Sequence, residues 1–283
     1  MPRFKLTIAY DGTAFHGWQK QHAPDPDHPG ERIRMRTVQE VVEQAIRDVV
    51  REPVLLQGAS RTDAGVHARA QTGAFSVAPF EESSEPEESS SKKPVWARLT
   101  EDRLRLAINS RLPDDVVITA LNRTRDDFEP ISDCTSKGYR YLLHAGLDRP
   151  LWDRAYVHHV RTELDLARMQ DAAARFIGEH DFAAFAAAGH GRLSTVRTVF
   201  DCSVTASVDE SPTINSNRYA IDISGNGFLH NMVRIVAGTI MEVGRGRLEP
   251  EQVNRAIESG DRRDAGPTLP PTGLCLMWMK YGE

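Results

Sequence analysis

The order in which periodic segments follow one another is the feature that most constrains the fold of this chain. In the first 125 residues, alternating apolar residues predict strands, and apolar stripes at helical spacing predict helices. Their order is strand, helix, strand, strand, helix, strand, which is the split βαβ pattern of ferredoxin-like and RNA-recognition folds. The predicted segments are strands at 4–10, 54–58, 70–77 and 116–121, a helix at 38–50, and a helix that begins after Thr100.

The second half of the chain repeats this order. It predicts strands at 138–145, 195–208, 218–224 and 274–281, and helices at 164–177 and 228–243. We therefore expect an α+β protein of two ferredoxin-like βαββαβ units, with largely antiparallel sheets and a cleft between the units. The expected domains are residues 1–125 and 126–283.

Local signals refine the boundaries in the first half. Thr37 and Glu40 have the spacing of a capping box, and Pro53 ends the helix that follows them. Residues 22–36 are polar and rich in proline and charge, which predicts a loop. Residues 79–94 are rich in Glu, Ser and Pro without periodicity, and predict a disordered acidic insertion.

Charge and cysteine content restrict the class of protein. The formal net charge is −5, but five glutamates lie in the insertion, and without them 35 acidic residues balance 35 basic ones. Net charge therefore does not exclude an RNA-binding protein, and the placement of arginines matters more. The three cysteines form no CxxC pair and no Cys/His cluster, so we expect neither a disulfide framework nor a metal. No apolar run of about 20 residues and no signal peptide occur, so we expect a cytoplasmic protein without membrane attachment.

Residues 58–71, GASRTDAGVHARAQ, contain the densest group of reactive side chains. Arg61, Thr62, Asp63 and His67 lie within seven residues of a small, polar segment between two predicted strands. Such a loop lets a backbone approach a ligand closely, although a turn with a local Arg61–Asp63 pair is the simpler interpretation. The segment lacks the second glycine of a GxSxG nucleophile elbow, and the chain contains no GxxxxGK[ST] phosphate loop.

This segment closely resembles the GRTDAGVHA signature of the tRNA pseudouridine synthase A family. Five further segments resemble the family in the same order and span nearly the whole chain. They are YDGTAFHGWQKQ (10–21), TVQE (37–40), KGYRYLL (137–143), FLHNMVRIVAGTIMEVG (228–244) and TGLCLMW near the C-terminus.

The resemblance implies an isomerase that converts uridine to pseudouridine at positions 38–40 of the tRNA anticodon arm. It also implies a homodimer that uses no cofactor and no metal. Asp63 would be the catalytic carboxylate, and Tyr139 would stack on the target uracil. Arg61 would help to extrude the base, Arg234 would pair with Asp63, and Leu274 would pack against the base.

The sequence departs from the family pattern at two positions and leaves alternatives open. Ser60 replaces a glycine, and Ile131 stands where the family has an arginine. A non-catalytic tandem RNA-recognition protein remains the alternative function, although Arg140 breaks the aromatic pattern typical of that class. A hydrolase that uses Asp63 with His67 is a third possibility. Whether Asp63 attacks C1′, attacks the uracil or acts as a base at C2′ also stays open.

Overall fold

The computed structural model describes residues 1–24, 28, 30, 32–80, 93–187, 194–208 and 217–282. The chain divides into two compact units, an N-terminal unit of residues 1–134 with 282–283 and a C-terminal unit of residues 135–281. Residues 126–134, which we assigned to the second domain from the sequence, therefore lie in the N-terminal unit. Most of the predicted acidic insertion, residues 81–92, lies outside the described residues.

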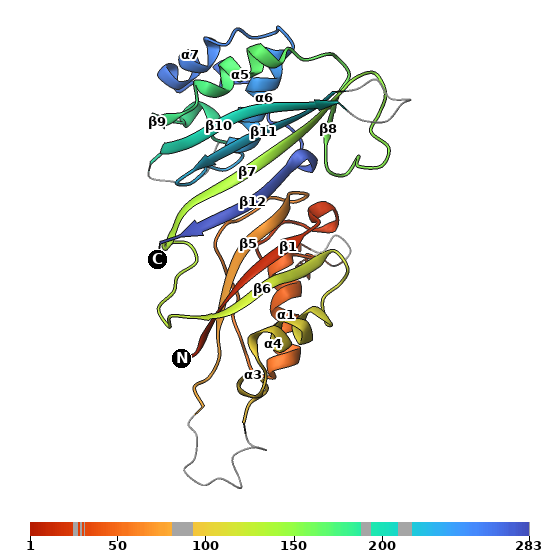
Figure 1. The fold of residues 1–283 in the computed structure, drawn as a ribbon, viewed down its shortest axis with the longest axis vertical. Helices are drawn as coiled ribbons and strands as arrows, with labels where there is room; N and C mark the ends of the chain where they lie inside the picture. The colour runs from red at the N-terminus through yellow and green to blue at the C-terminus, as the bar shows by residue number, and fades with distance from the viewer. Residues whose placement is uncertain are drawn as a thin grey trace. The chain divides into compact units, whose positions relative to one another are not determined.

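The N-terminal unit is built on an antiparallel sheet in the order β6-β1-β5, with β4 paired to the other edge of β5. If these four strands are numbered 1 to 4 in chain order, their order in the sheet is 4-1-3-2, which is the order of a βαββαβ unit. Helices α1 and α4 contact each other and cover one face of the sheet (Figure 1). The strands are β1 (Arg3–Tyr10), β4 (Gln57–Gly58), β5 (His67–Ser76) and β6 (Val116–Thr124), and the helices are α1 (Val38–Val50), α3 (Val95–Arg98), α4 (Glu101–Asn109) and the 3-10 turn η1 (Gly12–Ala14).

The core of this unit lies between the sheet and the helices. Alternate residues of β1 are buried, as the period-two pattern predicts, and Leu6 and Ile8 are fully inaccessible to solvent. Val42 and Ile46 on α1 and Ile108 on α4 face them from the helices, also at 0% exposure. The apolar stripe of α1 therefore fixes which side of the helix faces the sheet.

Between residues 22 and 40, the structure differs from the sequence-based prediction in two details. The region 22–36 contains a hairpin of β2 (His22–Pro24) and β3 (Arg32–Arg34) in addition to loop. Thr37 is the N-cap residue of α1, but it makes no side-chain cap bond, and Glu40 instead pairs with Arg34 at 3.4 Å. The capping box is unnecessary because backbone carbonyls of residues 17 and 18 accept from the first helical amides, at 3.2 and 3.0 Å.

The C-terminal unit repeats the architecture, which confirms the predicted α+β fold class. Its sheet has the order β12-β7-β11-β10-β9, and a short strand, β8, runs parallel to the end of β7. The strands are β7 (Cys134–Ala145), β8 (His158–Val160), β9 (Gly178–Asp181), β10 (Val196–Val208), β11 (Asn217–Gly225) and β12 (Leu274–Tyr281). The helices are α5 (Leu166–Ala174), α6 (Met232–Gly244) and α7 (Gln252–Ser259), with 3-10 turns at Ala183–Phe185, Arg262–Asp264 and Pro271–Gly273.

Two helices of this unit are shorter than predicted. α6 begins at Met232 and not at 228, because Asn231 adopts a left-handed conformation with φ 62°. α5 ends at Ala174, three residues before the predicted end, and Ile177 from the predicted apolar stripe is 44% exposed. Strands β8 and β9 and helix α7 have no counterpart in the sequence-based prediction. Within the described part of the chain, helices fall short of the length and apolarity required to cross a bilayer.

Candidate active site

The loop that carries Asp63 connects β4 to β5 and is held from inside by the sheet. Gln71 on β5 is fully buried, and its side-chain amide donates to the carbonyl of Ser60 at 2.6 Å and accepts from the Ser60 amide at 3.2 Å. The Ala59 amide donates to the Thr72 carbonyl at 2.9 Å. The start of the loop is therefore fixed by β5, and the serine found in place of the family's glycine is accommodated there.

A second segment, Tyr10–Lys20, holds the loop from its other side, and we call it the clasp. The Trp18 amide donates to the Thr62 carbonyl at 3.0 Å, and the hydroxyls of Tyr10 and Thr62 share a hydrogen bond of 2.7 Å. Downstream of Asp63, the Gly65 amide donates to the Phe15 carbonyl at 3.3 Å. The backbone on both sides of Asp63 is therefore bonded to the clasp.

The clasp approaches the loop closely because it contains glycine at the contact points. A Cβ atom on Gly12 would lie 2.0 Å from the Val66 carbonyl oxygen, and one on Gly17 would lie 2.7 Å from the Thr62 carbonyl oxygen. Gly17 also has φ +87°, a conformation that L-residues rarely adopt. The glycines of the segment YDGTAFHGW are thus required sterically, because the backbone of the clasp packs directly against the backbone of the loop.

Asp63 is half-buried at the tip of this framework, and Arg61 is exposed. The Val66 amide donates to the Asp63 carbonyl at 3.2 Å, which closes a turn directly after the aspartate. The side chain of Asp63 therefore projects from a backbone whose torsions are set by neighbouring bonds. This arrangement suits a carboxylate that must meet one atom of a substrate reproducibly.

His67 has a structural contact in the same framework. Its imidazole is 6% exposed, and its Nδ1 atom accepts from the Gly12 amide at 3.0 Å. An Asp11 carboxylate oxygen lies 3.1 Å from Nδ1, but that oxygen also accepts from the Thr13 amide and hydroxyl at 2.9 and 2.6 Å. The imidazole therefore contacts polar groups of the clasp through its Nδ1 atom. This contact gives His67 a role in anchoring the loop.

The other three predicted site residues lie in the C-terminal unit. Tyr139 on β7 is 7% exposed and contacts Phe228 edge-on, with ring centroids 5.3 Å apart. Leu274 is the first residue of β12 and is 6% exposed. Arg234 is half-buried in the first turn of α6.

Arg234 is held by two neighbours from its own unit. Its Nε donates to the Leu269 carbonyl at 2.6 Å, and its Nη1 donates to the side-chain oxygen of Asn231 at 2.8 Å. The Tyr141 hydroxyl donates to the adjacent Pro270 carbonyl at 2.7 Å, and burial raises the pKa of this hydroxyl. Residues 269 and 270 therefore tie the start of α6 to β7 just before β12 begins. The predicted pair between Asp63 and Arg234 joins residues of different units and stays a prediction.

Several residues that organise the site were not predicted from the sequence to have a role in it. Tyr10 and Gln71 hold the Asp63 loop, and Asn231 holds Arg234. Trp18, interpreted as a packed residue, is 1% exposed, which confirms that interpretation. Ile131, which stands at the position of a family arginine, is 71% exposed in the N-terminal unit.

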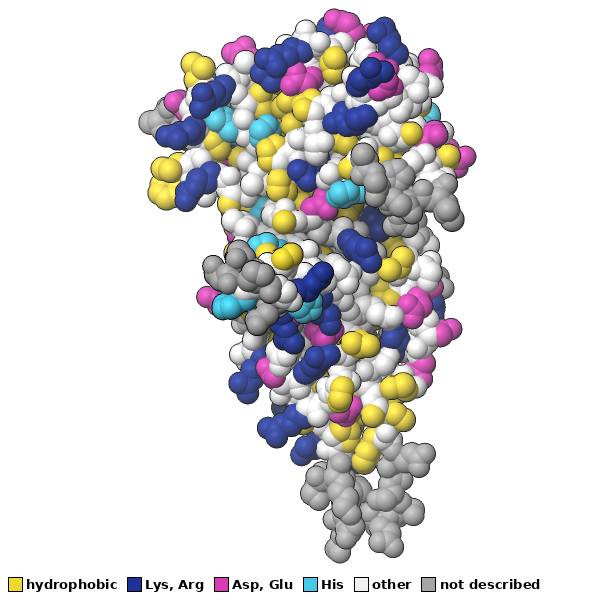
Figure 2. Space-filling model, turned by 180° about the vertical axis from the view of Figure 1, so that it is seen from behind, with side chains coloured by type: hydrophobic (Ala, Val, Ile, Leu, Met, Phe, Trp, Pro, Cys, Tyr) yellow, Lys and Arg dark blue, Asp and Glu magenta, His cyan; other side chains and the backbone are white. Residues whose placement is uncertain are grey.

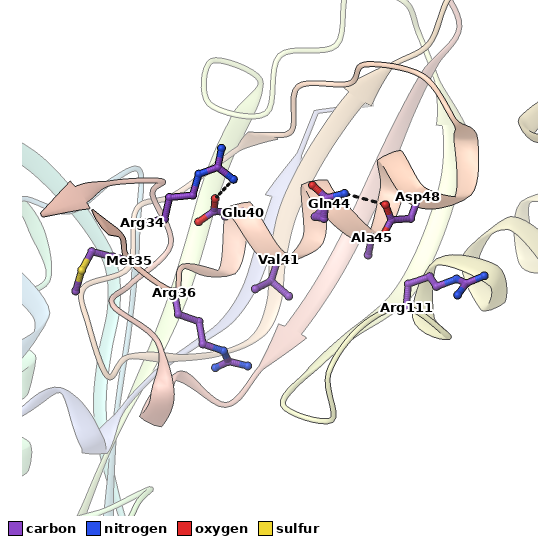
Figure 3. Close-up of a pocket in the computed structure, with 9 residues that line it drawn as sticks. All are labelled: Arg34, Met35, Arg36, Glu40, Val41, Gln44, Ala45, Asp48 and Arg111. Carbon is purple, nitrogen blue, oxygen red and sulfur yellow. Dashed lines mark hydrogen bonds and ion pairs between the residues drawn. The ribbon is translucent and has the colours of Figure 1, made fainter. Parts of the chain in front are cut away.

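A separate, open pocket of about 420 Å³ runs along α1 and contains none of the predicted site residues (Figure 3). Its charges are largely paired: Arg34 contacts Glu40 at 3.4 Å, and the Gln44 amide donates to Asp48 at 2.8 Å. It is lined by Arg34, Met35, Arg36, Glu40, Val41, Gln44, Ala45, Asp48 and Arg111. Among the described residues, acidic, histidine and cysteine side chains form no group that could hold a metal ion.

Basic side chains are spread over the surface although the net charge is negative. Figure 2 shows Lys and Arg side chains distributed over one face of the molecule, among Asp and Glu side chains of the opposite sign. Exposed Arg61 and Arg69 flank Asp63 along the chain within the N-terminal unit. The segment that carries Asp63 therefore also carries exposed positive charge, which binding of a phosphate backbone requires.

Comparison with known proteins identifies the family. A sequence profile of tRNA pseudouridine synthases matches residues 172–282. The chain is 38% identical over 281 residues to tRNA pseudouridine synthase A 2 of Clostridium perfringens, covering 99% of this chain and 100% of the relative. It is 40% identical, with the same coverage, to tRNA pseudouridine synthase A of Caldicellulosiruptor saccharolyticus and of Pelobacter propionicus. Because identity of this degree extends over essentially the full length of these proteins, the chain belongs to the tRNA pseudouridine synthase family.

Proposed function

We propose that this protein isomerises uridine to pseudouridine in the anticodon arm of tRNA, with Asp63 as its catalytic carboxylate. The observation that carries the proposal is the backbone framework around Asp63. Thr62 is bonded through both its carbonyl and its hydroxyl, and Gly65 is bonded on the other side. Such preorganisation suits a group that acts on the reacting atoms.

The chemistry accounts for a single carboxylate. Pseudouridine formation breaks the bond between C1′ and N1, turns the uracil, and joins C1′ to C5. Departure of the base leaves positive charge at C1′, which an ionised carboxylate stabilises or traps, as in glycosidases. After the new bond forms, C5 loses its proton and the freed N1 gains one, so the product is an isomer of the substrate. No water enters and no group leaves, so a second carboxylate and a cofactor have no step to perform.

The roles that we propose for most of the remaining site residues arise because the target base is stacked in the RNA and must be reached. The target nucleotide must be flipped out of the arm at a cost of a few kcal/mol. We propose that exposed Arg61 occupies the vacated space and that Tyr139 stacks on the uracil beside Leu274. We further propose that Arg234 pairs with Asp63, because a nearby guanidinium favours the ionised carboxylate.

Location and assembly are also part of the proposal. The three cysteines are free, which supports a reducing compartment such as the cytoplasm. The family resemblance supports tRNA positions 38–40 as targets and a homodimer as the assembly. Sedimentation at several concentrations tests the dimer, and mapping of pseudouridine in tRNA from a deletion strain tests the positions.

The decisive experiment is replacement of Asp63 with asparagine, which keeps the shape and removes the charge. Tritium release from tRNA that contains 5-tritiated uridine should fall at least about 10³-fold, while tRNA affinity stays within about threefold. The matched control is Asp153→Asn, at a half-buried aspartate whose carboxylate pairs with Arg218. We expect the control to retain activity.

The same assay separates the alternatives. Isomerisation releases the C5 label, whereas RNA binding alone and glycoside hydrolysis do not. An Asp63→Asn protein that keeps activity within tenfold of wild type, free of contaminating enzyme, would contradict the catalytic role of Asp63.

A further inference from the structure

The residue directly before Asp63, Thr62, is held through both its backbone and its side chain. The Thr62 carbonyl accepts from the Trp18 amide at 3.0 Å, and the Thr62 hydroxyl is 2.7 Å from the Tyr10 hydroxyl. Thr62 is 7% exposed and Tyr10 is 5% exposed, so this hydroxyl pair is shielded from water. A shielded hydrogen bond is replaced less readily by water than an exposed one, so it constrains geometry more strongly.

Burial of the Tyr10 ring does not require its hydroxyl. The ring packs against Trp18, with centroids 6.2 Å apart, in space that phenylalanine would fill equally well. Phenylalanine would also spare the protein a buried polar group, which is costly when unpaired. The presence of a hydroxyl at position 10 is therefore explained by its hydrogen bond to Thr62, the residue that precedes Asp63.

The strand pairing is irregular at this place. In the pairing of β1 with β5, Ile8 lies opposite Gln71 but Tyr10 lies opposite Ala68. Two residue steps along β1 therefore correspond to three along β5, which is a β-bulge. Such bulges change the direction of side chains and are frequent beside active sites. Here the bulge lies where β5 leaves the loop, at the point where Tyr10 contacts Thr62.

We propose that Tyr10 is a positioning residue for catalysis. Its hydroxyl fixes Thr62, and Thr62 in turn fixes the direction in which the Asp63 carboxylate projects toward the flipped nucleotide. Tyr10 touches neither the substrate nor the reacting atoms in this scheme. The inference rests on the proposed function, in which Asp63 is the catalytic carboxylate.

Four variants test the proposal: Tyr10→Phe, Thr62→Val, the double variant, and Thr62→Ser, which retains the hydroxyl. The control is Tyr219→Phe, which removes another largely buried tyrosine hydroxyl, bonded to the Leu164 carbonyl at 2.8 Å and outside the proposed site. For each protein we would measure the single-turnover rate of tritium release, the tRNA dissociation constant and the melting temperature.

We expect Tyr10→Phe and Thr62→Val each to lower the single-turnover rate about tenfold to a hundredfold, because small misplacements of a reacting group have effects of this size. The double variant should be no slower than the slower single variant, because both remove the same bond. Thr62→Ser should stay near the wild-type rate. The dissociation constant should stay within about twofold throughout. Tyr219→Phe should lower the melting temperature as much as Tyr10→Phe does, without lowering the rate.

Two results would overturn the positioning role. One is a Tyr10→Phe rate within twofold of wild type, and the other is multiplicative losses in the double variant. If Asp63→Asn is inactive in the same assay while Tyr10→Phe is fast, only the positioning role fails. If Asp63→Asn is active, the proposed function itself fails. Tyr10→Phe removes a single oxygen and leaves the buried ring in place, so the comparison does not depend on whether Thr62→Val folds.

Discussion

Replacement of Gly17 with alanine would show how strongly the rate depends on the position of the Asp63 loop. Gly17 has φ +87°, and an added Cβ would lie 2.7 Å from the Thr62 carbonyl oxygen and 3.2 Å from the Ala64 amide nitrogen. The substitution therefore has two effects. It strains the backbone at residue 17, and it pushes the loop away from the clasp.

The structure gives the size of each effect. A left-handed alanine costs about 1–2 kcal/mol. Ordinary contact begins near 3.4 Å, so relief of the 2.7 Å contact requires the Thr62 carbonyl to move by about 0.7 Å. A shift of this size beside a reacting group lowers rates by roughly tenfold to a hundredfold. We therefore expect the turnover to fall by that factor, with a loss of stability of about 1–2 kcal/mol from the backbone strain and a further loss from the displaced loop.

A second glycine separates the two effects. Gly246 has φ +70°, and a Cβ added to it meets no atom within 4 Å, so Gly246→Ala carries the backbone strain alone. We would compare melting temperatures and single-turnover tritium release for both variants. Gly246→Ala should be destabilised but fully active. If Gly17→Ala is as fast as Gly246→Ala, the rate does not depend on the clasp and our reasoning about the loop is wrong.

Two further predictions concern Tyr139 and the cysteines. We propose that the Tyr139 hydroxyl also takes part in removal of the C5 proton. Tyr139→Phe keeps the ring and its edge contact with Phe228, so tRNA affinity should be unchanged while turnover falls roughly 10²–10⁴-fold, the usual loss for a general acid–base group. A Phe variant as fast as wild type would exclude this role of the hydroxyl. Tyr139→Leu should weaken tRNA binding as well, by about 1–3 kcal/mol. Burial raises the pKa of the Cys202 thiol and shields it. In the native protein at about pH 8.5, alkylation should therefore modify half-buried Cys134 and Cys275 while Cys202 stays unmodified until the protein is unfolded, as peptide mass spectrometry would show.

The sequence predicted the fold because its elements carry strong periodic signals. The alternation in β1 and the stripe in α1 each place their apolar residues on one side, and both elements occur with nearly the predicted bounds. Periodicity failed at residues 54–58, an apolar run of which only Gln57–Gly58 is strand. The Val54 carbonyl accepts from the Arg47 side chain at 2.7 Å, and the Leu56 amide donates to Glu43 at 3.0 Å, so side chains replace strand partners. Leu55 is 71% exposed, which an apolar pattern does not anticipate.

The sequence led to a proposal for the chemistry of the candidate site, but it did not predict the contacts that support the Asp63 loop. Asp63 stood out because reactive side chains cluster around it within a motif. The bond between Tyr10 and Thr62 joins residues 52 positions apart, and nothing in either local pattern indicates it. A tyrosine at the end of an apolar alternation is expected in the core, and Tyr10 is indeed 5% exposed. Its polar function depends on what the fold brings to its hydroxyl, and periodicity carries no information about that.

Two polar side chains of α1 explain how an irregular loop keeps its place. Gln39 accepts from the Lys20 amide at 2.9 Å and donates to the Leu56 carbonyl at 2.7 Å. Glu43, whose side chain is 4% exposed, accepts from Lys20 at 2.8 Å, from Arg47 at 2.7 Å and from the Leu56 amide. A buried carboxylate is tolerated only when its oxygens are satisfied. Arg47 lies on the same helix, but the partners Lys20 and Leu56 are available only in this arrangement of segments. The helix thus fixes the end of the clasp at residue 20 and the approach to the loop at residue 56. The clasp and the approach to the Asp63 loop, which meet at Thr62, are therefore both tied to the same helix, α1. The position of Asp63 thus depends on α1 as much as on its own loop.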